Sequence, residues 1–311
     1  LLLLVAFFAS VAVGSVHIGI KDVVSSLFSS TQYSYIIRNI RLPRSLGSAL
    51  CGVLLALSGV AFQTSFRNPL ADPYLLGVSS GSTFAIALGT LLGLVLQEIY
   101  SLPLLAFLGG LGASFLTLSI GRRHPSTIIL CGIPLSSHFS ALTSLLIYHN
   151  RRSLQGVYFW TMGSFSAMTR NKVMVLSVVT LFVLFYMVHS SQKMDLLLID
   201  DSSARSLGLE PERSRRSILL VATVATAAAV SYCGIIGFAG ILAPHLARKL
   251  VGNTHKKLIP GSAFLGAFLL LLADTLSRTL ISPSEIPVGV ITSLLGCPMF
   301  LILAFKGAHH E

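Results

Sequence analysis

Three arginines are the side chains best suited to polar recognition in this sequence. Arg41 and Arg44 flank a Leu-Pro pair, and Arg278 follows an apolar run far later in the chain. A guanidinium group suits bidentate pairing with a carboxylate. Interfacial arginines also anchor membrane proteins to lipid headgroups. The sequence therefore leaves two interpretations, docking of an acidic partner and headgroup anchoring.

Residue patterns for catalysis or metal binding are missing. The four cysteines, Cys51, Cys131, Cys233 and Cys297, form no C-x-x-C pair, and the nine histidines show no metal-ligand spacing. His138 and His245 stand alone, whereas an intramembrane enzyme needs a nucleophile with its base or a set of metal ligands. The chain also lacks a G-x-x-x-x-G-K-[ST] phosphate loop. We expect no enzyme activity, no ATP hydrolysis, no metal and no cofactor.

Composition identifies the environment in which these residues work. Hydrophobic residues make up 53% of the chain and charged residues only 11%, which is far more apolar than a soluble protein whose outside faces water. The net charge of +11 lies in short loops between apolar runs, where headgroups and the membrane potential account for it. We expect a lipid bilayer as partner and no nucleic acid.

The apolar runs predict an all-α, polytopic membrane protein of about ten helices in one domain, residues 1–311. Residues 1–20 read as a retained first span rather than a signal peptide, and 21–43 as an extramembrane segment. The bias of Lys and Arg modestly favours cytoplasmic N and C termini. The further expected spans are 44–66, 74–97, 102–121, 126–148, 173–190, 217–233, 236–250, 260–280 and 287–305.

Prolines and small residues punctuate these runs. Ser48 and Gly52 lie four residues apart, a spacing that lets helix backbones approach closely in lipid. A proline inside a helix removes a backbone hydrogen bond and bends it, and turn residues restrict their neighbours. Five residues are therefore predicted to shape helix ends rather than to contact a transported molecule: Asn68, Pro69, Asp72, Pro73 and Pro244.

The long polar segment near 190–217 differs in kind from the other loops. Residues 202–209 read as a short helix that Gly208 ends, with Asp201 or Ser202 as its N-cap. Leu207 and Leu209 could then face a partner, although a solvated loop is an equally good interpretation of the composition. The candidate partner-contacting residues are Asp201, Ser203, Ala204, Arg205, Leu207, Gly208 and Leu209.

A set of motifs along nearly the whole chain resembles the FecCD-type permeases, which import iron-siderophores, haem and cobalamin. The matching residues are Arg41-Leu42-Pro43-Arg44, Ser58-Gly59 with Gln63, Asn68 to Pro73, Leu76 to Gly81, Trp160 with Met162-Gly163-Ser164, Ala204 with Leu207-Gly208, Ile236-Gly237-Phe238, Pro244-His245 with Arg248, Pro260, Gly266-Ala267, Ala273-Asp274, Arg278, Glu285 to Val290 and Gly296-Cys297-Pro298.

The resemblance implies ten helices, a second permease copy as homodimer or close homologue, two separate ATP-binding subunits and an extracytoplasmic substrate-binding protein, all at a bacterial inner membrane. It places docking of the binding protein on Arg41, Arg44 and Arg278, and ATPase coupling on the 200–209 helix. Asp200-Asp201 stands where the family usually has Gly-Glu. We expect an iron chelate as cargo, with cobalamin as the alternative. An ion-coupled secondary transporter would need ionisable groups at mid-membrane depth, and Asp274 is one of few candidates.

Overall fold

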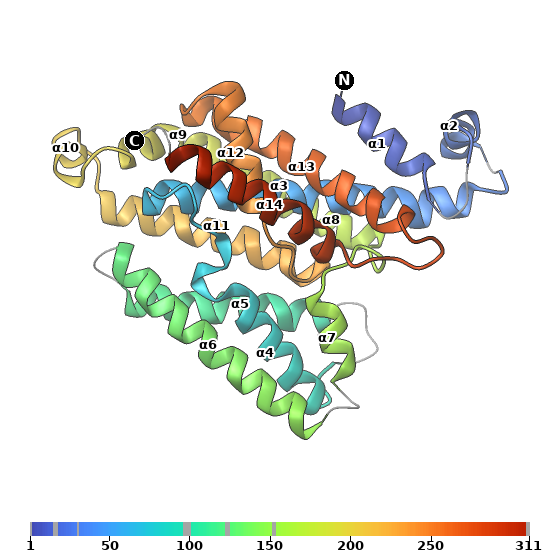
Figure 1. Cartoon of the computed structure of the whole chain (residues 1–311), viewed down its shortest axis with the longest axis horizontal. Coiled ribbons are helices and arrows are strands. Elements are labelled where there is room, and N and C mark those ends of the chain that lie inside the picture. Colours follow the sequence, from blue (N-terminus) through green and yellow to red (C-terminus); the bar gives the residue numbers. More distant parts are fainter. Residues whose placement is uncertain are drawn as a thin grey trace.

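The computed structural model describes residues 2–14, 18–29, 31–95, 101–121, 125–150 and 154–308, and these residues form helices joined by turns and loops (Figure 1). The α-helices are α1 (Leu2–Ala12), α2 (Ile20–Phe28), α3 (Leu42–Phe66), α4 (Val78–Leu91), α5 (Ser101–Ile120), α6 (Pro125–His149), α7 (Gln155–Thr161), α8 (Arg170–His189), α9 (Ser191–Leu197), α10 (Asp201–Ser206), α11 (Pro211–Cys233), α12 (Ala239–Val251), α13 (His255–Thr279) and α14 (Val288–Ala308). A π-helix, η1 (Ile36–Arg41), and a 3₁₀ helix, η2 (Pro73–Leu76), complete them.

Six helical segments in the described part of the chain are long and apolar enough to cross a bilayer. They are Ile36–Phe66, Ser101–Ile120, Pro125–His149, Arg170–His189, Pro211–Cys233 and His255–Thr279. The expected count of about ten is therefore not confirmed. The predicted spans 74–97 and 236–250 correspond only to the 14-residue α4 and the 13-residue α12. Left-handed backbone at Gly77 and Phe238 delays the start of each helix, and α4 also ends early, at Leu91.

The segment before α3 corrects the predicted start of the second span. Helical backbone begins at Ile36, within the stretch predicted to be extramembrane, and runs through η1 directly into α3. Pro43 explains the π-helix at this join, because a proline ring clashes with the carbonyl one turn earlier and a widened turn relieves the clash.

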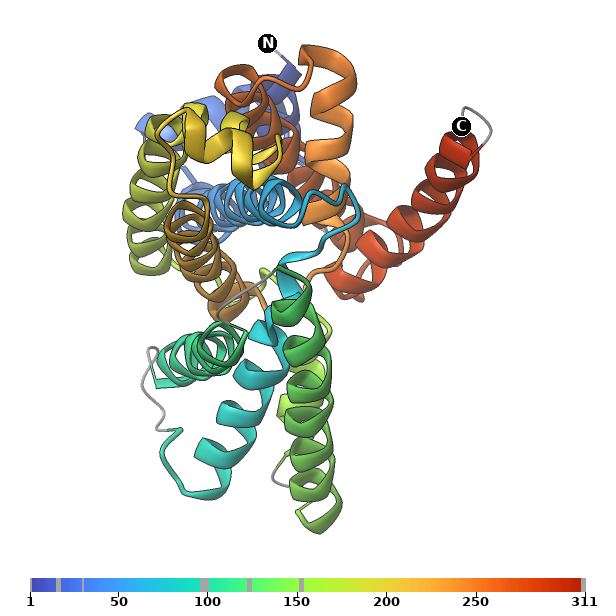
Figure 2. The same cartoon turned by 90° about the vertical axis from the view of Figure 1, so that its left-hand side faces the viewer.

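The helices form two groups (Figures 1 and 2). The larger group surrounds α3, which packs against α8, α11, α12 and α13. The smaller group, α4 to α7, lies below it and meets it where α5 packs on α11. In Figure 2, α14 leans away from both groups and touches α12 and α13.

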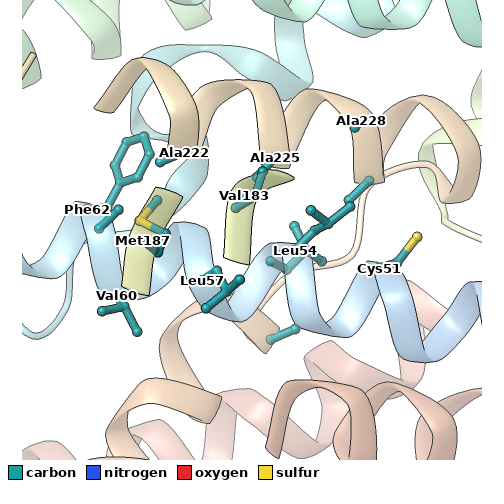
Figure 3. Close-up of a cluster of buried hydrophobic side chains, with 14 of the residues drawn as sticks. Cys51, Leu54, Leu57, Val60, Phe62, Val183, Met187, Ala222, Ala225 and Ala228 are labelled. Carbon is teal, nitrogen blue, oxygen red and sulfur yellow. The ribbon is translucent and has the colours of Figure 1, made fainter. Parts of the chain in front are cut away.

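Side chains of α3 form the centre of the larger group. Figure 3 shows Phe62 of α3 beside Met187 of α8 and Ala222 of α11, and all three are fully buried. Since lipid tails are as apolar as these side chains, close packing rather than escape from water stabilises such a core in a bilayer.

Two glycines of α3 allow its closest helix contacts. A Cβ atom on Gly52 would lie 2.1 Å from the carbonyl oxygen of Gly266 in α13, and one on Gly59 would lie 1.7 Å from that of Gly240 in α12. Any side chain here would push the helices apart. The Gly52 contact shows how the predicted small-residue spacing is used in the tertiary structure.

Candidate functional site

At one end of α3, Arg44 takes part in a buried ion-pair network. Its Nε donates to Asp274 Oδ1 of α13 at 2.9 Å, and its Nη1 donates to Glu285 Oε1 at 2.7 Å. Arg44 is 5% exposed and Asp274 is fully buried, whereas the Glu285 side chain is 41% exposed. Glu285 is thus the member of this network that is most accessible from outside.

The other two arginines predicted for docking cap the end of α1. Arg278 Nη2 lies 3.3 Å from Asp274 Oδ2 and donates to the Ser10 carbonyl oxygen at 3.0 Å. Arg41 Nη1 donates to the carbonyl oxygens of Val11 and Ala12, at 3.0 and 2.7 Å. Basic side chains often satisfy the free carbonyl groups at a helix C-terminus in this way.

The structure therefore brings together all three arginines that the sequence singled out, but it buries their guanidinium groups on internal partners. Docking of a binding protein at these arginines stays a prediction. Sequence reasoning missed the carbonyl acceptors of α1, since a backbone acceptor has no signature in the residue types.

At the opposite end of α3, α10 is a short helix with well-defined ends. The Asp200 carboxylate accepts the backbone N–H of Ser203 at 2.9 Å and is the N-cap, so the predicted cap, Asp201 or Ser202, was wrong by one or two positions. The predicted end at Gly208 is confirmed, with φ of 83°. Bonds from Gly208 N to Arg205 O and from Leu209 N to Ala204 O, at 2.9 and 3.0 Å, complete a Schellman motif.

The candidate coupling residues divide between an exposed and a buried side. Leu207 is 65% exposed, and Arg205 reaches Glu212 in an exposed ion pair at 3.3 Å. Ala204 is fully buried, and Leu209 is only 8% exposed. The prediction that both leucines face a partner was therefore wrong for Leu209, because the Schellman turn folds it back against the bundle.

Asp201 ties α10 to two long helices. Its Oδ1 accepts from Arg215 Nη2 of α11 at 3.1 Å and also from Arg67, the residue that ends α3. Arg67 Nε further donates to the Leu197 carbonyl oxygen at 2.7 Å. Burial alone would raise the pKa of Asp201, but hydrogen bonds from Arg215 and Arg67 outweigh it and hold that pKa below its usual value.

Arg67 was not among the predicted site residues. The one signal in the sequence was its position directly before Asn68-Pro69, where a helix is expected to end. Arg67 does end α3 there, with a left-handed φ of 49° that is uncommon for residues other than glycine.

The residues predicted to shape helix ends lie at turns, apart from Pro244. Asn68 Oδ1 accepts the N–H of Leu70 at 2.9 Å, and Pro69 follows Asn68 in that turn. Asp72 Oδ1 accepts the N–H of Tyr74 at 2.7 Å and caps η2, whose first residue is Pro73.

Pro244 lies inside α12 rather than at its end. A proline cannot donate to the carbonyl oxygen four residues earlier, and that carbonyl, of Gly240, instead lies 3.5 Å from Gln63 Nε2. The prediction that Pro244 shapes a helix end was therefore wrong: α12 continues through it, and the Gln63 side chain of α3 replaces the lost backbone bond.

A hydroxyl-lined cavity of about 310 Å³ opens between α4, α6 and α7. No lining residue carries a charge, and the hydroxyls include those of Ser79, Ser80, Thr83, Ser140, Thr143 and Ser144. Thr83 and Thr143 each donate to a carbonyl oxygen one turn earlier at 2.8 Å. Their oxygens therefore remain available as weak, uncharged hydrogen-bond acceptors.

Two curated proteins match this chain over nearly its whole length. The hemin transport system permease protein HmuU of Yersinia pestis is 34% identical over 319 residues, covering 98% of this chain and 93% of its own. The vitamin B12 import system permease protein BtuC of Salmonella arizonae is 37% identical over 312 residues, covering 99% of this chain and 93% of its own.

A solved structure is similar over the same length. The chain aligns with a metal-chelate-type ABC transporter in an inward-facing conformation, with a TM-score of 0.89 and 33% identity over 98% of this chain and 96% of the other. The family model described as the FecCD transport family matches residues 2–306. This chain belongs to the FecCD transport family and is a membrane permease subunit of the ABC importer type.

Proposed function

We propose that this chain is the translocating subunit of an importer that carries a metal chelate across the bacterial inner membrane, with an iron chelate, siderophore or haem, as the preferred cargo. Cobalamin is the alternative, because a vitamin B12 permease and a hemin permease resemble the chain to similar degrees. ATP hydrolysis belongs to two separate ATP-binding subunits. The N and C termini lie in the cytoplasm.

The observation that best supports the proposal is the attachment of α10. Leu207 is exposed for a partner, while Asp201 on the same helix pairs with Arg67 and Arg215. A push on α10 by an ATP-binding subunit would therefore reach α3 and α11 directly. Because α3 packs against α8, α11, α12 and α13, its displacement would change the packing of the whole larger group.

The cargo would pass the hydroxyl-lined cavity. Its lining has no charge, and Thr83, Thr143 and Ser144 donate their hydroxyl groups to their own helices, so it offers few strong contacts and would release cargo easily. Specificity would then rest mainly with the extracytoplasmic binding protein.

A second permease copy would complete the pathway. Helix α14 leans away from the bundle (Figure 2) and exposes Leu294 and Leu295, by 69% and 59%. An apolar helix face without a protein neighbour suits either lipid or the matching helix of a second copy, and a closed two-fold pair is the commonest symmetry among homo-oligomers.

The coupling assignment is tested with the complex of permease and ATP-binding subunits. Leu207→Asp places a charge on an exposed side chain, so the permease should stay folded in detergent while the ATP-binding subunits dissociate on purification. Leu250→Asp is the matched control, because Leu250 is 73% exposed on α12. An intact Leu207→Asp complex with transport-coupled ATP hydrolysis would remove α10 from the coupling site.

A further inference from the structure

A second cavity, of about 320 Å³, opens at the α10 end of the bundle. One side of the cavity is polar and lies where α3 and α12 end and α13 begins. The polar lining residues on this side include Gln63, Arg67, Arg248 and His255. Leu198 and Leu258 supply an apolar side. None of the functions proposed above uses this cavity.

Most of the polar lining is already satisfied by internal partners. His255 Nδ1 lies 2.6 Å from Asp195 Oδ1, and its Nε2 lies 2.7 Å from the Thr64 hydroxyl. Asp195 Oδ1 also accepts the backbone N–H of His255, the first residue of α13, at 3.0 Å. This N–H is therefore not available to a bound anion. Arg67 is paired with Asp201.

Arg248 is different, because no carboxylate in the described part of the chain pairs with it. Its Nη1 donates to the neutral Gln63 Oε1 at 2.5 Å, and Gln63 is itself buried. A partly buried guanidinium without a counter-ion is unfavourable, since removal from water is compensated only by an opposite charge or by further hydrogen bonds. The remaining donors of Arg248 are therefore available to an anion in the cavity.

The lining also indicates the class of anion. Asn68 and Asn253 add neutral amide groups, and the lining contains no carboxylate. The volume exceeds that of a single small oxyanion, and Leu198 and Leu258 could contact an attached apolar group. An arginine beside neutral amides suits the oxygens of a phosphate group.

We propose that this cavity binds a phosphate group, presented either by a phospholipid headgroup of the adjacent leaflet or by free phosphate, with Arg248 as its principal ligand. The bound group would neutralise Arg248. It would also lie beside Arg67, and so next to the attachment of α10 to α3.

The test uses the purified chain in a phosphate-free maltoside detergent and buffer, with two probes, inorganic phosphate and phosphatidylglycerol. Thermal unfolding and native mass spectrometry should show that one probe binds and raises the Tm. Stabilisation by inorganic phosphate identifies a free-anion site, and stabilisation by phosphatidylglycerol alone identifies a headgroup site.

Variants assign the binding to Arg248. Arg248→Gln should weaken binding by about tenfold or more, the effect of losing charge-assisted hydrogen bonds, and Arg248→Lys should restore part of it. Arg213→Gln is the matched control, because Arg213 is 84% exposed and pairs with Glu210 outside the cavity. Asn253→Asp, which adds a negative charge at the lining, should also weaken binding and serves if Arg248→Gln does not fold. Failure of both probes to bind, or wild-type affinity in Arg248→Gln, would overturn the proposal.

Discussion

Asp274 of α13 and Arg44 of α3 form a buried ion pair, with 2.9 Å between Oδ1 and Nη2. Arg278 shares the same carboxylate at 3.3 Å. One acid therefore joins two of the arginines that the sequence offered for docking. Because both arginines pair with Asp274, substituting either one would disturb the fold of the permease as well as any surface that a binding protein would contact.

The first prediction concerns the stability of this network. Asp274→Ala leaves two arginines buried without their shared carboxylate, and removal of one partner from a buried pair costs about 3–5 kcal/mol. We expect a large fall in Tm and in the yield of folded protein. Glu285→Gln is the control, since its partly exposed pair should contribute at most about 1 kcal/mol. Equal stability of the two variants would show that the Asp274 network is not structural.

The second prediction separates docking from headgroup anchoring. Glu285 Oε1 accepts a hydrogen bond from Arg44 Nη1 at 2.7 Å, so a carboxylate of the binding protein would have to compete with Glu285 for this donor. Glu285→Gln should then raise the affinity for the cognate binding protein several-fold in a surface-immobilised assay, because a neutral amide competes less well for a guanidinium.

The charge-reversal experiment completes this test. Arg44→Glu faces Asp274 and Glu285, so its Tm is measured first. A folded Arg44→Glu permease should lose docking, and a Glu→Arg change on the binding protein should partly restore it. Unchanged affinity in Glu285→Gln, Arg41→Ala, Arg44→Ala and Arg278→Ala alike would leave headgroup anchoring and internal capping as the roles of these residues.

The third prediction follows from the lowered pKa of Asp201. A carboxyl group with a lowered pKa in the folded state stabilises that state above its unfolded pKa of about 3.9 and loses this contribution as the pH falls through the folded value. Wild type should therefore be more stable than Asp201→Asn at pH 7, and the gap in Tm should shrink below about pH 4. Glu210→Gln, in an exposed pair, serves as control. A gap that stays constant with pH would contradict the ionic attachment of α10.

The fourth prediction tests the close contact between α3 and α12. Gly59→Ala would place a Cβ atom 1.7 Å from the Gly240 carbonyl oxygen, so the helices must separate at a cost of about 1–3 kcal/mol or more. Gly112→Ala in α5 is the matched control, because nothing lies within 4 Å of its Cβ position and alanine favours a helix by up to about 1 kcal/mol. Similar thermal stability of the two variants would argue against this contact.

The sequence alone was sufficient to predict the all-helical class, the family and the residue at which α10 ends. A chain with 53% hydrophobic residues has few alternatives to membrane helices, because an unpaired backbone group in lipid costs several kcal/mol. The turn at Gly208 was also predictable, since a left-handed helix end favours glycine, which has no side chain to oppose it.

Tertiary structure alone decided which side chains are free to act. Leu207 and Leu209 look alike in the sequence, yet the Schellman turn exposes one and buries the other. Arg44, Arg67 and Arg248 are the same residue type, and only the fold pairs the first with Asp274, the second with Asp201, and leaves the third without a carboxylate in the described part of the chain. The physical reason is that pairing and burial depend on residues hundreds of positions apart meeting in space, and local patterns carry no record of those distances.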